Sequence, residues 1–280
     1  MIRVLRPGDE TELERFLAPL ADSSMFLLAN SRKAGLADRG MPFQGTYAGA
    51  FESGRIVGVA AHSWLGTVLL QAPRELPAIV RAAVAASGRR VTGLIGPYAQ
   101  ALDAHQALRL PQPANAHREL LFALDLPELR VPEALARARV VCRAPRTDEM
   151  GLLADWRCAY VEETAVETSG PDLRAHCRVS VELLRADGAL LVLEEGGQIV
   201  AMTAFNARIA ECVQVGGVYT PPQLRSRGHA RSAVAGSLLA AREQGARRAI
   251  LFTGERNAAA QRSYRALGFA GIGDYGLLPV

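Results

Sequence analysis

A short loop rich in arginine and glycine lies in the last third of the chain. Its six residues, Arg225-Ser226-Arg227-Gly228-His229-Ala230, fit the pattern Arg/Gln-x-x-Gly-x-Gly/Ala, between a strand expected at 213–219 and a helix. Gly228 lets the backbone approach a ligand closely, and the helix start contributes unpaired N–H groups and a positive dipole end. Arg225 and Arg227 add fixed positive charge. The pattern predicts a site for a pyrophosphate-sized anion, although such a turn by itself is most often only a turn.

The elements that follow the loop make the prediction more specific. Apolar residues three and four apart predict a helix from about Gly228 to Gly245. A strand at 249–252 and a second helix from Asn257 to Leu267 come next. Strand, anion loop, helix, strand and helix therefore succeed one another, an order that a simple turn does not explain.

This order resembles the acyl-CoA site of the GNAT superfamily of N-acyltransferases, over about residues 140–280. The resemblance rests on three segments, Val218-Tyr219-Thr220, Arg225 to Ala230, and Asn257-x-x-Ala260-x-x-x-Tyr264-x-x-x-Gly268-Phe269. It implies an α/β fold with a mixed sheet (α+β) and acetyl-CoA as cofactor. In the family, the loop amides hold the pyrophosphate, and the preceding strand and the later Asn hold the pantetheine arm. The family's Tyr, here Tyr264, protonates the departing thiolate.

Several of these residues also have a purely structural explanation. Asn257 is a preferred helix N-cap, and we expect it to serve both as a cap and as a ligand of the pantetheine arm. Tyr264 follows Ala260 by four residues, so its ring should face the side that packs on the sheet. His229 belongs to the predicted cofactor loop and would either bind a phosphate or be exposed to solvent, and of the two we expect exposure.

Direct attack of a neutral amine on a thioester requires positioning, a polarised carbonyl and two proton transfers. The resemblance implies that the N–H of Val218 polarises the carbonyl, a contact typically worth about 3 kcal/mol. The general base departs from the family pattern. Gln214 stands where some members have a catalytic Glu, and an amide cannot accept the proton. We expect the proton to leave through water to Glu163 or Glu211.

The acceptor region contains a group of carboxylates, Glu162, Glu163 and Glu167. They lie where the family keeps the helices that cover the acceptor, and they would either attract a cationic amine or form a solvated acidic face, which is the reading we favour. The predicted function is N-acetyl transfer to a primary amine of a small molecule or peptide. A non-catalytic acyl-CoA sensor or scaffold and a transferase resembling mycothiol synthase are the alternatives. The sequence does not identify the acceptor.

The first half resembles a degraded copy of the second. Val4-Leu5-Arg6 and the hairpin at Gly54 to Val59 reappear as Val141-Cys142-Arg143 and Gly197 to Met202, at similar spacing. The alternative is that any two α/β halves share such hairpins. The anion loop does not recur, because Ala72 to Pro77 contains two prolines and no glycine.

We therefore predict two tandem GNAT-like domains. Residues 1–130 form a degenerate domain without the cofactor loop, and residues 131–280 form the acetyltransferase domain. Tandem GNAT proteins with one degenerate half are known in the superfamily. The resemblance implies that the first domain packs, shapes the substrate cleft or forms a homodimer.

Composition limits the remaining classes. The chain has 280 residues, of which 49% are hydrophobic, enough for two cores. Its net charge is +4, but the arginines are scattered among acidic residues without an aromatic platform, which argues against nucleic-acid binding. The four cysteines contain no Cys-x-x-Cys pair, which argues against a metal site and a disulfide framework. With no apolar run of about 20 residues and no signal-peptide pattern, we expect a cytoplasmic protein without a membrane partner.

Overall fold

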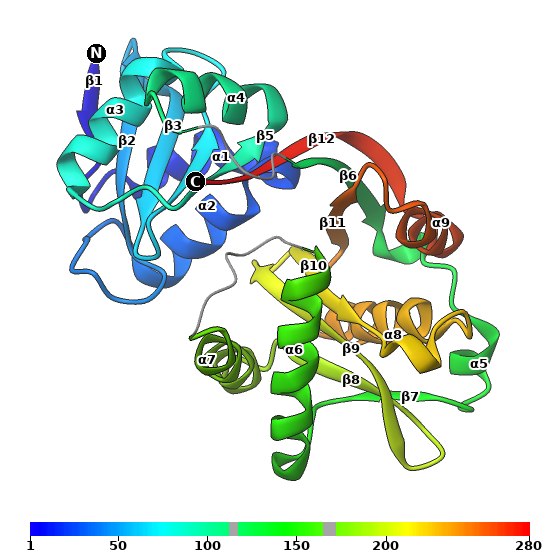
Figure 1. Cartoon of the computed structure of the whole chain (residues 1–280). Helices are drawn as coiled ribbons and strands as arrows, with labels where there is room; N and C mark the ends of the chain where they lie inside the picture. The colour runs from blue at the N-terminus through cyan, green and yellow to red at the C-terminus, as the bar shows by residue number, and fades with distance from the viewer. Residues whose placement is uncertain (112–116, 165–171) are drawn as a thin grey trace. The chain divides into compact units, whose positions relative to one another are not determined.

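The computed structural model describes residues 1–111, 117–164 and 172–280, which divide into two compact units (Figure 1). One unit comprises Met1–Leu120 together with Gly273–Val280, and the other comprises Leu121–Ile272. Each has a mixed sheet with helices on its faces, as the sequence predicts. None of the helices in the described ranges is long and apolar enough to cross a membrane.

The first unit alternates strands and helices around one sheet. Its elements are β1 (Ile2–Val4), α1 (Glu10–Leu17), α2 (Ala21–Ala34), β2 (Gly45–Glu52), β3 (Arg55–Ser63), β4 (Thr67–Gln71), α3 (Leu76–Ser87), β5 (Gly93–Pro97), α4 (Tyr98–Ala107) and β12 (Ala270–Pro279). The sheet order is β1-β2-β3-β4-β5-β12, in which β4 and β5 are parallel. Ile79 of α3 and Ala101 of α4 are fully buried against one face, in a cluster that also contains Leu94.

The second unit repeats this plan. Its elements are β6 (His117–Asp125), α5 (Glu133–Ala136), β7 (Val141–Arg143), α6 (Met150–Thr164), α7 (Leu173–Ala186), β8 (Leu190–Glu195), β9 (Gln198–Arg208), β10 (Cys212–Tyr219), α8 (His229–Glu243), β11 (Arg248–Gly254) and α9 (Ala258–Leu267). The sheet order is β7-β8-β9-β10-β11-β6. Leu153 of α6 packs with Met202 on one face, whereas Ala233 of α8 packs with Ala201 on the other. Figure 1 shows α6 and α8 on opposite sides of these strands.

The order of elements from β1 to β6 recurs from β7 to β12, with two helices after the first strand of each series. This recurrence confirms the predicted repeat. The elements around the anion loop also match their predictions, because α8 begins directly after Gly228 and α9 directly after Asn257. The strand between them, β11, is longer than the predicted 249–252.

Each unit is completed by a strand from the other half of the chain. β6 follows α4 in sequence, but from Leu121 onward it belongs to the second unit, whose sheet it joins beside β11. β12 follows α9, but it pairs with β5 from Tyr275–Pro97 to Pro279–Gly93 and so belongs to the first unit. The units therefore differ from the predicted division at residue 130. The C-terminal strand belongs to the first unit because Leu278 buries its side chain in the cluster that contains Ile79 of α3 and Ala101 of α4.

This exchange predicts that a C-terminal substitution weakens the first unit. Leu278→Ala should cost about 2–5 kcal/mol, because it leaves a cavity at a side chain that is 1% exposed. Hydrogen exchange followed by mass spectrometry should show faster exchange in Met1–Leu120. Ile272→Ala, at an exposed position of the same strand, is the control. Faster exchange confined to Leu121–Ile272 would contradict the exchange of strands.

Candidate functional site

Two parallel strands of the second unit separate halfway along their length. β10 and β11 pair from Cys212–Arg248 to Val215–Leu251. Both strands are fully described and continue to Tyr219 and Gly254, but no further pair joins them. The pairing of β10 with β9 is irregular between Gly216 and Tyr219, and a bulge of this kind bends its strand. The last residues of β10 thus offer a strand edge that an extended ligand could pair with.

Two consecutive glycines make this bulge possible. A Cβ on Gly216 would collide with the side-chain amide of Asn206, which is exposed and would have to move aside. Gly217 has a φ of +58°, which is costly for any residue with a Cβ. Val218, the residue predicted to polarise a carbonyl through its N–H, follows directly and is half-buried. The bulge therefore determines where the backbone of Val218 lies.

The predicted anion loop has the geometry that its sequence indicates. Gly228 adopts a φ of +81° as the N-cap of α8 and provides no side-chain cap, so the first N–H groups of the helix lack intrahelical partners. Ser226 and Arg227 are exposed beside it. Arg231, which we did not predict, lies close by, with Nη2 3.5 Å from the position that a Cβ on Gly228 would occupy. Arg231 follows Gly228 by three residues, about one helical turn, and this spacing could have predicted that the two are neighbours.

Two buried polar atoms beside the loop have no hydrogen-bond partner among the described residues. They are Oγ1 of Thr220, in a residue 8% exposed, and Nε2 of His229, in a residue 5% exposed. The expected exposure of His229 is therefore wrong. A side chain at the first helical position leans back past the helix start, and here Nε2 lies 3.8 Å from Glu195 at the end of β8. Such atoms, with the N–H groups above, fit a ligand rich in acceptor oxygens.

Arg225 connects the loop to the end of α6. Its Nη2 donates to Oε1 and Oε2 of Glu163 at 2.8 and 2.7 Å, and its Nε donates to the carbonyl oxygen of Thr220 at 2.9 Å. Two residues with predicted roles, a phosphate contact and a proton acceptor, are thus paired with each other. Glu167 lies outside the described residues.

Glu211 is too far from the loop to serve as the predicted proton acceptor. It precedes β10, whereas the loop follows the opposite end of that strand, so the two are separated by roughly 25 Å. The carbonyl oxygen of Glu211 accepts the N–H groups of Arg247 and Arg248 at the start of β11. Glu211 is close to Gln214 in sequence, but an extended strand rises about 3.3 Å per residue, so a few residues along β10 amount to a large distance.

Gln214 is buried in the middle of β10, with 1% of its surface exposed. Its Nε2 donates to the carbonyl oxygen of Val215 at 2.8 Å, while Oε1 has no partner among the described residues. Gln214 thus places an uncharged amide at a position shielded from water. As the sequence indicates, this side chain cannot accept the amine proton.

The start of α9 is capped by its predicted residue. Oδ1 of Asn257 accepts the N–H of Ala260 at 3.1 Å. Further along the helix, the ring of Tyr264 lies 6.5 Å from that of Phe122 in β6 and 6.1 Å from that of Phe269. The ring therefore faces the sheet, as predicted, and its action on a thiolate stays a prediction.

The matching region of the first unit is occupied by its own residues. The N–H of Ala72, just after β4, donates to Oε1 of Gln100 at 2.7 Å. A Cβ on Gly96 would lie 2.7 Å from the carbonyl oxygen of Leu70, so β4 and β5 remain close there. Pro77 lies in the first turn of α3 and removes an N–H.

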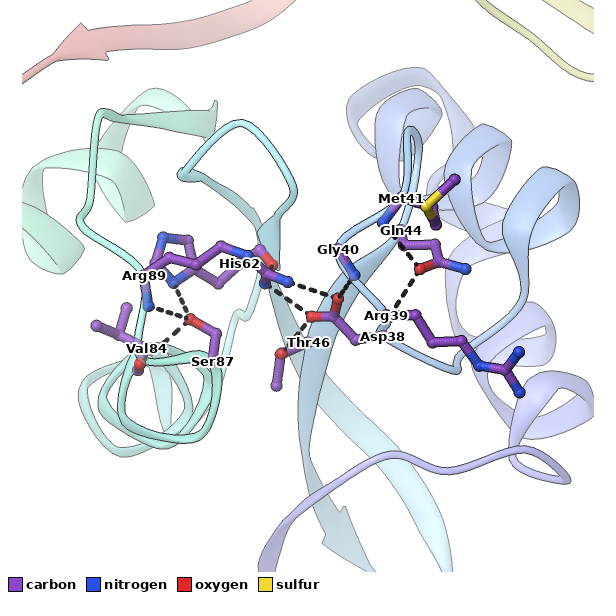
Figure 2. Close-up of polar contacts among 10 residues, drawn as sticks. All are labelled: Asp38, Arg39, Gly40, Met41, Gln44, Thr46, His62, Val84, Ser87 and Arg89. Atoms are coloured by element: carbon purple, nitrogen blue, oxygen red, sulfur yellow. Dashed lines mark hydrogen bonds and ion pairs between the residues drawn. The ribbon is translucent and has the colours of Figure 1, made fainter.

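The first unit has a polar cluster of its own, drawn in Figure 2. Asp38 accepts two hydrogen bonds from Arg89, at 2.6 and 2.7 Å, and one from Thr46 at 2.6 Å. The Arg89 guanidinium holds the pKa of Asp38 down at about 2, against the penalty of partial burial. This pair fastens the segment before β2 to the residues after α3.

His62 and Ser87 in the same cluster have the spacing of a base and a nucleophile. Ser87 Oγ lies 2.5 Å from Nδ1 of His62, whose Nε2 lies 3.0 Å from the carbonyl oxygen of Gly66. A carbonyl only accepts, so Nε2 carries the proton and the Ser87 hydroxyl donates to Nδ1. Ser87 ends α3, where the negative dipole end opposes an oxyanion, and His62 is wholly buried. The pair is therefore structural.

Part of the second half of the chain resembles a known protein family. Residues 152–269 match the model of the Acetyltransferase (GNAT) family, a range that contains β10, the loop, α8 and α9. Residues 152–269 belong to the GNAT acetyltransferase family. A search of curated proteins found no significant match.

Solved structures match nearly the whole chain. A GCN5-related N-acetyltransferase from Sphaerobacter thermophilus aligns with a TM-score of 0.59 and 17% identity, over 99% of this chain and 93% of that one. A tandem GNAT protein from the clavulanic acid biosynthesis pathway gives 0.55 and 14%, over 99% and 96%. A GNAT-family acetyltransferase from Colwellia psychrerythraea gives 0.54 and 16%, over 100% of both chains. The chain therefore has the tandem GNAT fold.

The cap at Asn257 is expected to contribute measurably to stability. Asn257→Ala should cost about 1 kcal/mol, because the N–H of Ala260 loses its acceptor. Asn257→Ser should restore most of that loss, since a serine hydroxyl also caps. Urea unfolding of the three proteins measures the difference. Equal losses in both variants would mean that capping is not what this side chain contributes.

A buried carboxylate that we did not predict, Glu119 of β6, should make stability depend on pH. It is 7% exposed, and burial raises its pKa from 4.5 to about 7. Between these values the folded chain binds more protons than the unfolded chain, so stability falls as pH rises, by on the order of 3 kcal/mol in total.

Glu119→Gln should therefore match the wild type at pH 4 and exceed its stability at pH 8, as measured by urea unfolding. Glu243→Gln, at an exposed position, controls for the change in net charge. A difference between Glu119→Gln and the wild type that is the same at both pH values would contradict the raised pKa.

Proposed function

We propose that this protein transfers an acetyl group from acetyl-CoA to a primary amine, by direct attack of the amine on the thioester. The observation that carries the proposal is the parting of β10 and β11 directly before a glycine-capped helix start. The strand edge suits an extended amide-containing arm, and the helix start suits a pyrophosphate. Acetyl-CoA has both parts and supplies the acetyl group as a thioester.

The proposed cofactor contacts are Val218, Thr220, Arg225, Ser226, Arg227, Gly228, His229, Ala230, Asn257 and Tyr264. Gly228 and the first turn of α8 direct N–H groups at the pyrophosphate, and Arg231 adds a charge beside them. The buried Thr220 hydroxyl and His229 Nε2 would gain the partners that they lack among the described residues.

Three groups carry the proposed chemistry. The N–H of Val218 polarises the carbonyl from its position after the bulge, as an oxyanion donor. The hydroxyl of Tyr264 supplies a proton to the leaving sulfur. Glu163 takes up the amine proton through water, since Glu211 lies at the wrong end of β10. The acceptor amine of a small molecule or peptide arrives as a cation, which the negative charge of Glu163 favours, and it attacks as the neutral amine once it has lost that proton.

Calorimetric titration with acetyl-CoA tests the proposal. The wild type should bind about one equivalent with micromolar affinity, and Gly228→Glu should weaken binding at least about tenfold, because its carboxylate repels the pyrophosphate. Gly188→Glu is the matched control, since Gly188 also has a positive φ (+63°) and has open space around it. Absence of binding to the wild type would refute the proposed function. Binding to Gly228→Glu at wild-type strength would exclude the loop as the site.

A further inference from the structure

The ion pair between Glu163 and Arg225 uses a guanidinium that belongs to the cofactor loop. Arg225 is the first residue of the Arg-x-x-Gly-x-Ala loop, and Glu163 is the penultimate residue of α6. Both carboxylate oxygens of Glu163 accept from the same nitrogen, Nη2. The pair therefore joins the proposed cofactor loop to the helix that carries the proposed proton acceptor.

This pair is poorly suited to be permanent. Each side chain is 44% exposed, and water and salt screen an ion pair at that exposure, so it contributes little. A pyrophosphate on the loop offers the same guanidinium several oxygens and a higher charge, in charge-assisted hydrogen bonds. The bond from Nε to the Thr220 carbonyl oxygen, at 2.9 Å, leaves Nη2 free to change partner without being broken.

Glu163 lies near the end of β10, so its separation from Arg225 would change the charge at that end of the strand. The Arg225 guanidinium carbon lies 5.7 Å from the centre of the Tyr219 ring, at the end of β10, and that ring lies 6.1 Å from the ring of Trp156 in α6. Burial raises the pKa of the Tyr219 phenol, the negative charge of Glu163 raises it further, and the Arg225 guanidinium lowers it. Glu163 is thus close enough to the end of β10 to act electrostatically there.

We propose that Glu163 and the cofactor pyrophosphate compete for the Arg225 guanidinium, so that binding of the cofactor releases Glu163 to receive the amine acceptor. The inference rests on the proposed function, because it assumes that the loop binds acetyl-CoA. It gives Glu163, the proposed proton acceptor, a second role in which it couples the binding of the two substrates. Its carboxylate becomes available to the amine when phosphate oxygens have taken its place on Arg225.

Calorimetry with coenzyme A distinguishes competition from a structural tether. Removal of the competing charge in Glu163→Gln should tighten binding, by about two- to fivefold, as expected for an exposed pair. If the ion pair instead held the loop in its binding conformation, Glu163→Gln would weaken coenzyme A binding, because the loop would lose that support. Glu162→Gln removes the same charge one residue earlier and should leave the affinity unchanged. Arg225→Gln should bind more weakly than the wild type, and adding Glu163→Gln to it should have no further effect.

The outcomes separate this inference from the function on which it rests. Tighter binding in Glu163→Gln that disappears in the Arg225→Gln background supports the competition. Binding that is unchanged or weaker in Glu163→Gln overturns the inference but leaves the proposed function standing. An equal gain in Glu162→Gln would also overturn it, since the effect would then be one of net charge. No binding of coenzyme A to the wild type overturns both.

Discussion

The candidate site depends on one interruption of regular pairing, the bulge at Gly216 to Val218. A parallel pair of strands normally hydrogen-bonds along its whole overlap, which leaves no edge for a ligand. Here β10 bends, and its pairs with β11 end at Val215 and Leu251. The bend places Gly217 at a positive φ, and it brings Gly216 so close to the Asn206 side chain that a Cβ would displace it. The backbone of Val218 lies within this bulge, and the loop and the start of α8 come next in the chain.

The two units are built on the same order of elements, but the first uses this region for its own stability. Where β10 leaves backbone groups at a strand edge, the N–H after β4 is taken by Gln100, and Pro77 removes another donor from the helix start. Buried polar groups need partners, and they obtain them from the protein, from ordered water or from a ligand. The first unit provides them internally. In the second unit, Thr220 and His229 keep buried atoms without partners among the described residues.

Arginines around the loop show why charge by itself does not identify a ligand contact. Arg225, Arg227 and Arg231 all lie close to Gly228 in sequence, yet Arg225 is already paired with a carboxylate from another helix. A guanidinium has five donors and can serve two acceptors in turn. Whether it binds a ligand or a side chain depends on residues 62 positions away, which the local pattern does not contain.

The sequence by itself determined the local features of this protein. It predicted the helix start at Gly228 and the cap at Asn257, because capping, left-handed φ and apolar spacing are set by neighbouring residues. It also indicated the repeat and the family, through short segments that recur or that resemble known motifs. The tertiary structure decided the burial of His229, the pairing of Arg225 with Glu163, the distance of Glu211 from the loop and the exchange of β6 and β12. These depend on contacts between residues far apart in the chain. Their free energy comes from burial and charge in the folded state, which no short segment specifies.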